Sequence, residues 1–262
     1  MSEDAADVLR RLISYEREHA REVAQLVEPI EEGALVLNPE IDSIWSANYM
    51  ELQGTRHDHH GLAELADRLL GPRGYRHRHV VPTEPDHAAR LAPGFAELGW
   101  TVNRNVYMRL SRPPEREGAP AVEVSREETE AVRTAVRSRR PDRTPGLVEE
   151  MLAWDARMDR SAAARWFAAF QDGKPASSCV LYERDGVGQV ETVTTDPELE
   201  GRGLASGVVL AAARASREAG HELTFIVADA DDWPWRLYQR LGFDRVGESC
   251  TFVLKPEPPQ PP

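Results

Sequence analysis

A glycine-rich segment followed by a tyrosine-bearing segment constrains this chain more than any other feature of its sequence. The first reads Glu200-Gly201-Arg202-Gly203-Leu204-Ala205, and the second reads Leu237-Tyr238-Gln239-Arg240-Leu241-Gly242-Phe243. Glycines let a backbone approach a ligand closely, and a helix start offers free N–H groups and positive dipole, so the first segment is typical of a phosphate site. Gly242 can end the second segment's helix because glycine adopts positive φ cheaply. We therefore expect a cofactor site with the Tyr238 hydroxyl beside it.

The length, composition and charge of the chain limit the classes of protein to which it can belong. The chain has 262 residues, 41% of them hydrophobic and 29% charged, enough for one large or two modest globular domains. No apolar run could span a bilayer, and the first four residues are acidic where a signal peptide is basic, so we expect a cytoplasmic protein without membrane contact. The formal charge of −12 argues against nucleic acid as a partner. Cys179 and Cys250 lack the spacing of a zinc or redox motif and are expected to be buried thiols without a disulfide.

Hydrophobic periodicity predicts a mixed succession of helices and strands. Helices are expected over 4–28, 61–70, 86–98, 125–137, 146–158 and 203–219, and around Tyr238. Strands are expected over 34–37, 44–52, 76–81, 102–110, 121–124, 164–170, 176–182, 189–195, 223–228 and 247–254. Ser125 is a plausible N-cap, and the turn signals Asp172-Gly173 and Asp185-Gly186 indicate a three-stranded meander.

The two halves of the chain echo one another. Gly61-Leu62-Ala63 corresponds to Gly203-Leu204-Ala205, and Phe95 to Gly99 corresponds to Tyr238 to Gly242 at nearly the same spacing. The first copy has neither the glycine-rich cradle nor the tyrosine, so it is interpreted as degenerate, although so short a match can also arise by coincidence. The predicted organisation is a degenerate domain over 1–111, a Pro-rich linker over 112–120, a complete domain over 121–255 and a disordered Pro-rich tail over 256–262.

The second half resembles the GNAT superfamily of N-acetyltransferases. Three pieces carry the resemblance in the family's order and spacing: Val193-Thr194-Thr195-Asp196-Pro197, the loop from Glu200 to Ala205, and Tyr238 to Phe243. Together with the internal repeat, the resemblance implies an α/β fold of the α+β mixed-sheet kind, with two GNAT-like units, each a mostly antiparallel central sheet flanked by helices. It also implies acetyl-CoA as co-substrate, attacked directly by an amine, and no metal.

The resemblance also implies roles for individual residues. Tyr238 matches the family's general acid, although a tyrosine packed with its hydroxyl on a carbonyl would look the same in sequence. Backbone groups of Val193 and Thr195 would hold the pantetheine arm and polarise the thioester. The expected cofactor-binding residues are Val193, Thr194, Thr195, Glu200, Gly201, Arg202, Gly203, Leu204, Ala205, Ser206 and Asp231. Two positions depart from the family: Glu200 stands where Arg or Gln is usual, and Asp231 where Asn is frequent.

A candidate base comes from strand alternation. Period two predicts that Gln189, Glu191, Val193 and Thr195 share one strand face, and Glu191 is the carboxylate among them. A solvated or Arg-paired Glu191 is an equal alternative, and Asp229, Asp231 and Asp232 are reserve candidates.

Other polar and aromatic clusters favour structural roles. His57-Asp58-His59-His60 has the composition of a metal site, but adjacent histidines rarely converge on one ion, so a solvated helix cap is favoured. Trp233 and Trp235 could line a cleft or only pack. The segment 138–143 could frame an acceptor site or be a solvated loop.

The sequence therefore predicts an N-acetyltransferase that moves an acetyl group from acetyl-CoA to an amine, most simply a small molecule, in a monomer or homodimer. One rival is a non-catalytic acyl-CoA-binding or sensing module, for which Glu200 is the motivating residue. Another rival is a structural or partner-binding protein.

Overall fold

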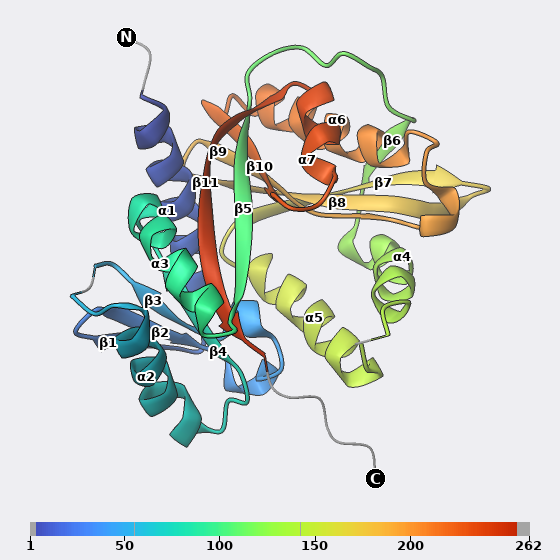
Figure 1. Cartoon of the computed structure of the whole chain (residues 1–262). Coiled ribbons are helices and arrows are strands. Elements are labelled where there is room, and N and C mark those ends of the chain that lie inside the picture. The colour runs from blue at the N-terminus through green and yellow to red at the C-terminus, as the bar shows by residue number, and fades with distance from the viewer. Residues whose placement is uncertain (1–3, 55, 142, 256–262) are drawn as a thin grey trace. The chain divides into compact units, whose positions relative to one another are not determined.

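The computed structural model describes residues 4–54, 56–141 and 143–255, and the chain divides into two compact units (Figure 1). Unit 1 holds residues 1–105 and 248–262, and unit 2 holds residues 106–247. The strands β5 (Thr101–Leu110) and β11 (Phe243–Leu254) contribute residues to both units. The Pro-rich tail expected over 256–262 lies outside the described residues. Within the described ranges, none of the helices combines the length and apolarity needed to cross a membrane.

Unit 1 is a sheet with helices. Its helices are α1 (Ala5–Val23), α2 (His59–Leu70) and α3 (Pro85–Glu97), with 3₁₀ turns at Pro39–Ile41, Trp45–Ala47 and Gly71–Arg73. Its other strands are β1 (Leu26–Ile30), β2 (Gly33–Leu37), β3 (Tyr49–Leu52) and β4 (Arg78–Pro82), in the order β1-β2-β3-β4-β11-β5. Leu62, Phe95 and Phe252 are among the fully buried side chains that form its core.

Two sequence expectations in unit 1 are wrong. Residues 24–28 were expected to continue the first helix, but α1 ends at Val23 and β1 pairs antiparallel with β2, from Leu26↔Leu37 to Ile30↔Gly33. Residues 44–48 were expected in a strand. They form a 3₁₀ turn because the buried Asn48 amide donates to the carbonyls of Ile41 and Ile44 (2.9 and 3.0 Å) and so competes with strand pairing.

Unit 2 contains the expected meander. Its helices are α4 (Arg126–Ser138), α5 (Pro145–Met158), α6 (Leu204–Glu218) and α7 (Pro234–Arg240), with a 3₁₀ turn at Pro197–Leu199. Its other strands are β6 (Ala121–Val124), β7 (Ala163–Gln171), β8 (Lys174–Arg184), β9 (Val187–Thr195) and β10 (Leu223–Asp229), in the order β11-β5-β10-β9-β8-β7-β6. β6 to β9 pair antiparallel, whereas β9 and β10 pair parallel.

Local signals in unit 2 act as the sequence predicts. Asp172 and Asp185, each followed by glycine, have positive φ at the two hairpin turns. The Ser125 hydroxyl accepts from the Glu128 N–H while Glu128 accepts from the Ser125 N–H, a complete capping box. Gly242 has φ +96° after α7, and a Cβ there would lie 2.2 Å from the Arg112 carbonyl oxygen.

Helices cover both faces of the unit 2 sheet. Cys179, Leu181 and Val190 pack with Val208 and Val209 of α6. Trp166, Val180 and Tyr182 belong to a second cluster with Met158 at the end of α5. Residues 112–120, expected to be a linker, lie in unit 2, where the Ala119 N–H donates to the Gly203 carbonyl (3.0 Å).

The repeat noticed in the sequence is visible as one succession of elements. Unit 1 has β3-α2-β4-α3-β5, and unit 2 has β9-α6-β10-α7-β11. The parallel pair of each succession is β3 with β4 and β9 with β10. Gly99 and Gly242, which correspond in the repeat, both have positive φ after the second helix.

Candidate functional site

The site begins with a break in the hydrogen-bond register of β9. Glu191 lies opposite Val180 and Thr194 lies opposite Ser178, so two residues of β9 face the single residue Cys179 of β8. This is a β-bulge, and within it Thr192 has φ +53°. The expectation that Gln189, Glu191, Val193 and Thr195 share one face is therefore wrong beyond Glu191. The inserted residue places Glu191 and Thr194, not Val193, on one face, because side-chain direction follows the register.

A pocket opens where β9 leaves its parallel neighbour. Pairing of β10 with β9 runs from Leu223↔Val187 to Ile226↔Val190, and both strands then continue. The pocket has a volume of about 250 Å³. It is lined by Val190, Glu191, Thr192 and Val193 of β9, Ile226, Val227, Ala228 and Asp229 of β10, and Pro234 and Tyr238 of α7. The two candidate catalytic residues, Glu191 and Tyr238, thus line one pocket.

Tyr238 is held inside unit 2 by its position on α7. Its side chain is 7% exposed and packs in the main apolar cluster with Leu237 and Leu241. Burial raises the pKa of the Tyr238 phenol, and the negative charge of Glu191 raises it further. The phenol therefore stays protonated at neutral pH, as a proton donor requires.

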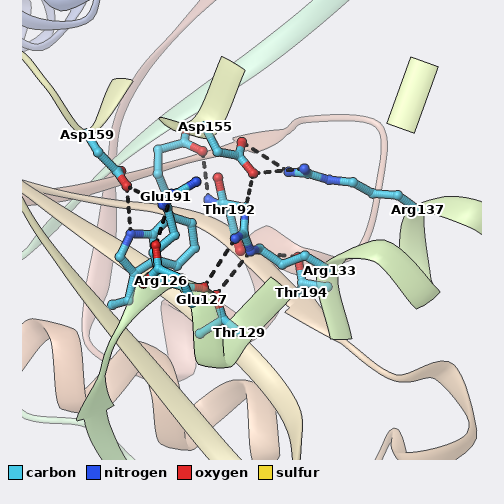
Figure 2. Close-up of polar contacts among 11 residues, drawn as sticks. Arg126, Glu127, Thr129, Arg133, Arg137, Asp155, Asp159, Glu191, Thr192 and Thr194 are labelled. Carbon is cyan, nitrogen blue, oxygen red and sulfur yellow. Dashed lines mark hydrogen bonds and ion pairs between the residues drawn. The ribbon is translucent and has the colours of Figure 1, made fainter. Parts of the chain in front are cut away.

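Glu191 is held by its own strand. One carboxylate oxygen accepts from the Thr192 N–H (2.8 Å) and the other from the Gln189 amide (3.4 Å). Figure 2 shows Glu191 and Thr192 among the polar side chains of α4 and α5. Glu191 lies opposite Val180 and Gln189 lies opposite Tyr182, on the sheet face that carries the Trp166 cluster.

The glycine-rich loop has the conformation of an anion cradle. Gly201 and Gly203 have φ +78° and +77°, and Gly203 is the N-cap of α6 without a side-chain cap. The first-turn N–H groups of a helix have no intrahelical acceptor, so those of Leu204, Ala205 and Ser206 suit a phosphate. The space a Cβ would occupy at Gly201 is open, which leaves room for a ligand. The backbone of this loop therefore offers a site for a phosphate group.

The charged residues around this cradle are mixed. Glu200 and Arg202 are both exposed, and Ser206 is buried in the first turn of α6. Arg139, at the C-terminus of α4, binds Asp196 (2.6 Å) and Glu198 (3.2 Å) just before the cradle. Of the segment 138–143, Arg139 thus contacts the turn that precedes the glycine-rich loop, whereas Asp142 lies outside the described residues.

A buried ion pair that sequence reasoning missed joins α4 to α5. Arg133 is fully buried, donates to Asp155 and the Thr129 hydroxyl, and stacks over Trp166 at 4.4 Å (Figure 2). Arg137 binds the same carboxylate at 2.8 Å. The available signal was an arginine four residues after Thr129 and next to the buried Val132, which places it toward the buried side of α4. The ion pair fixes the helix pair over the sheet face that carries Glu191.

The remaining expectations sort by position. Asp229 lines the pocket, whereas Asp231 and Asp232 are exposed beyond it. Trp235 packs against the main cluster and has the guanidinium groups of Arg236 and Arg245 over its ring, and Trp233 is 51% exposed. Asp58 caps α2 by accepting from the Gly61 N–H (2.9 Å), as the favoured helix-cap interpretation of the histidine cluster predicts. Cys179 is buried, Cys250 is half-buried, and both are free thiols.

Comparison with known proteins relates part of the chain to one protein family. Residues 129–243 match the model of the Acetyltransferase (GNAT) family. A search among curated proteins finds no significant match. A functionally unknown conserved protein from Staphylococcus epidermidis ATCC 12228 has a similar structure, with a TM-score of 0.68 at 15% identity over 87% of this chain and 93% of that one.

Two further structures match nearly the full length. A GCN5-related N-acetyltransferase from Kribbella flavida has a TM-score of 0.63 at 16% identity over 96% of both chains. A tandem GNAT protein from the clavulanic acid biosynthesis pathway has a TM-score of 0.53 at 13% identity over 98% of both chains. At these identities the likeness establishes the fold: the expected mixed α/β architecture with two units is confirmed.

Proposed function

We propose, from the match of residues 129–243 to the GNAT acetyltransferase family, that the chain transfers an acetyl group from acetyl-CoA to a primary amine of a small molecule by direct attack. One observation carries the proposal: Glu191 and Tyr238 line the same pocket, at the point where β9 leaves β10. The cradle at Gly201 to Gly203 lies on the same chain segment, directly after β9.

In this reaction Glu191 acts as the proton acceptor and Tyr238 as the proton donor. Acetyl-CoA supplies the acyl group as a thioester. Glu191 accepts, directly or through water, the proton that the amine must lose as its nitrogen bonds to the acyl carbon. Tyr238 donates its phenolic proton to the sulfur as the carbon–sulfur bond breaks. Proton exchange with water returns both residues to their starting states, so that one proton passes in balance from nitrogen to sulfur.

Backbone groups of the bulge supply the remaining assistance. Val193 follows Thr192 in the bulge and lines the pocket, so its peptide N–H is our candidate donor to the thioester oxygen. The Thr192 N–H is already used by the Glu191 carboxylate. Thr194 and Thr195 continue the strand toward the cradle and are proposed to contact the pantetheine arm.

The charge of the pocket supports an amine acceptor. Its lining residues within the described chain include the carboxylates of Glu191 and Asp229 and no lysine or arginine. Such a pocket favours a cation and disfavours an anion, because an unpaired negative charge beside two carboxylates is repelled. The volume of about 250 Å³ supports a small acceptor group.

A second candidate, a non-catalytic acyl-CoA-binding or sensing module, is favoured by one observation. Glu200 is exposed next to the cradle, where its charge opposes a pyrophosphate. The backbone contacts of the cradle do not depend on that side chain, so binding without efficient turnover is the outcome this candidate predicts.

Calorimetry with acetyl-CoA, followed by thiol release in the presence of a panel of primary amines, separates these functions. Tyr238→Phe is expected to leave the acetyl-CoA Kd unchanged and to lower kcat roughly 100-fold, the usual size of a general acid's contribution. Tyr75→Phe, at another buried tyrosine in unit 1, is the matched control and should change neither. Binding without thiol release for any amine would support the sensing module, and absence of binding would contradict both functions.

A further inference from the structure

We infer that Glu191 is also a positioning residue: its carboxylate holds the left-handed turn at Thr192, and this turn keeps β9 away from β10 so that the pocket can accept an acyl group. The identity of the ligand rests on the proposed function. The positioning itself rests on the register of β9 and the contacts of one peptide.

The backbone of Thr192 is strained. Its φ is +53°, a region that β-branched residues rarely occupy because the side chain collides with its own backbone. A regular β9 would place Thr192 opposite Cys179 and Val193 opposite Ser178 and would avoid this strain. The observed register instead places Thr194 opposite Ser178, so contacts of the folded chain must stabilise the extra residue.

Two side chains hold the peptide groups of Thr192 from either side. The Glu191 carboxylate accepts from the Thr192 N–H at 2.8 Å, and the Thr194 hydroxyl donates to the Thr192 carbonyl at 3.2 Å. The first contact is the stronger, since a charged acceptor roughly doubles the strength of a hydrogen bond. Gln189 donates to the other Glu191 oxygen, which fixes the carboxylate toward its own strand.

The bulge coincides with the opening of the pocket. Parallel pairing reaches Val190↔Ile226, and the bulge begins at the next residue, Glu191. Glu191, Thr192 and Val193 all line the pocket. A bulge bends its strand, so loss of the bulge would draw β9 toward β10 and narrow the space between them.

Removal of the carboxylate should therefore act on binding as well as on proton transfer. If the bulged strand is populated only in part, the affinity for acetyl-CoA falls by that fraction. If Glu191 acted only as a base and did not hold the bulge, removal of its carboxylate would leave the acetyl-CoA Kd unchanged. The two roles of Glu191 can thus be separated by variants that remove one role each.

Four variants of the full chain make this separation: Glu191→Ala, Glu191→Gln, Thr192→Gly and Glu191→Ala combined with Thr192→Gly. Glu191→Ala should raise the acetyl-CoA Kd roughly tenfold, the equivalent of one hydrogen bond to a charged group. Glu191→Gln keeps an oxygen acceptor for the Thr192 N–H, so it should keep the Kd within about twofold while turnover falls. In the double variant, glycine adopts positive φ without strain, so the Kd should recover although turnover does not.

Asp185→Gly is the matched control, because Asp185 also has positive φ but lies in the turn between β8 and β9. It should not change the acetyl-CoA Kd. Amide hydrogen exchange without ligand provides the second readout: Glu191→Ala should lower the protection of the Thr192 amide roughly tenfold.

The outcomes distinguish the inference from the proposed function. An acetyl-CoA Kd and a Thr192 protection unchanged by Glu191→Ala would overturn the inference, as would equal losses of affinity in the Ala and Gln variants. If wild-type protein bound no acetyl-CoA, the proposed function would fail, and the exchange measurement would still decide whether Glu191 holds the bulge.

Discussion

Arg133 and Asp155 form an ion pair inside the contact between α4 and α5, with the Arg133 side chain fully buried and that of Asp155 7% exposed. Burial lowers the pKa of Arg133, and Asp155 opposes that effect, so the guanidinium depends on its partner to remain charged out of water. Arg137 approaches the same carboxylate. One acidic residue of α5 thus anchors two cations of α4.

Asp155→Ala should destabilise the protein by about 3–5 kcal/mol, because it leaves a buried guanidinium without a counter-charge. Urea unfolding followed by circular dichroism measures the change. The double variant Arg133→Met with Asp155→Leu should cost much less than the single change, since it removes both charges of the fully buried pair and leaves only the partly exposed Arg137 without this carboxylate. Equal losses of unfolding free energy in the single and the double variant would show that packing, and not charge pairing, dominates this contact.

The stability of unit 1 should fall in acid because of His79. Burial lowers the pKa of His79 from 6.5 to about 3, with small contributions from His77 and Arg17, while its Nδ1 lies 2.9 Å from the Trp45 carbonyl. Below pH 6.5 the His79 imidazole binds a proton in the unfolded chain, whereas the buried ring of the folded protein stays neutral until the pH nears 3. The stabilisation is therefore complete above pH 6.5 and is lost at about 1.4 kcal/mol per pH unit as the pH falls toward 3.

Thermal unfolding across that pH range checks the His79 prediction. His79→Asn removes one titrating ring and should reduce the slope, and the buried His77, whose pKa burial also lowers, accounts for part of what remains. His60→Asn, at an exposed histidine of α2, should leave the slope as in wild type. A slope unchanged by His79→Asn would assign the acid sensitivity to another group.

The chain should bind one acetyl-CoA, because the parallel strands β3 and β4 of unit 1 stay paired to their last residues, whereas β9 and β10 of unit 2 separate before theirs. β3 and β4 pair from Met50↔Val80 to Leu52↔Pro82, and both the N–H and the hydroxyl of Thr83 donate to the Leu52 carbonyl (2.9 Å each). Calorimetry should return one site per chain, and Gly203→Asp should abolish it. A second site that survives Gly203→Asp would place cofactor binding in unit 1.

Gly207 is expected to be essential for the cradle although it lies inside α6. A Cβ at Gly207 would lie 2.2 Å from the Ala119 carbonyl oxygen, and the Ala119 N–H donates to Gly203 at the start of the helix. Gly207→Ala should weaken acetyl-CoA binding and lower the unfolding temperature. Gly146→Ala, at an α5 position with open space, is the control and should be neutral or stabilising by up to ~1 kcal/mol. Tolerance of both substitutions would contradict the close approach.

Sequence reasoning succeeded where the signal was local. Asp172-Gly173, Asp185-Gly186, the Ser125 cap and the Gly242 stop each depend on a few adjacent residues, and each appears in the structure as expected. It failed over 24–28 and 44–48, where strand pairing and the buried Asn48 outweigh local preference. The roles of Tyr238 and Glu191 remain predictions, now supported by a shared pocket.

Apart from β1 and the turn at Trp45–Ala47, the sequence by itself determined the succession of helices and strands, the internal repeat and the glycine positions of the cradle, because these follow from steric limits and hydrophobic period within short segments. Only the tertiary structure decided the bulge at Thr192 and the partnership of Arg133 with Asp155. The bulge depends on how β9 aligns with β8, and the ion pair joins residues on separate helices. Such contacts form when distant segments are packed together, and no local pattern in the chain records them.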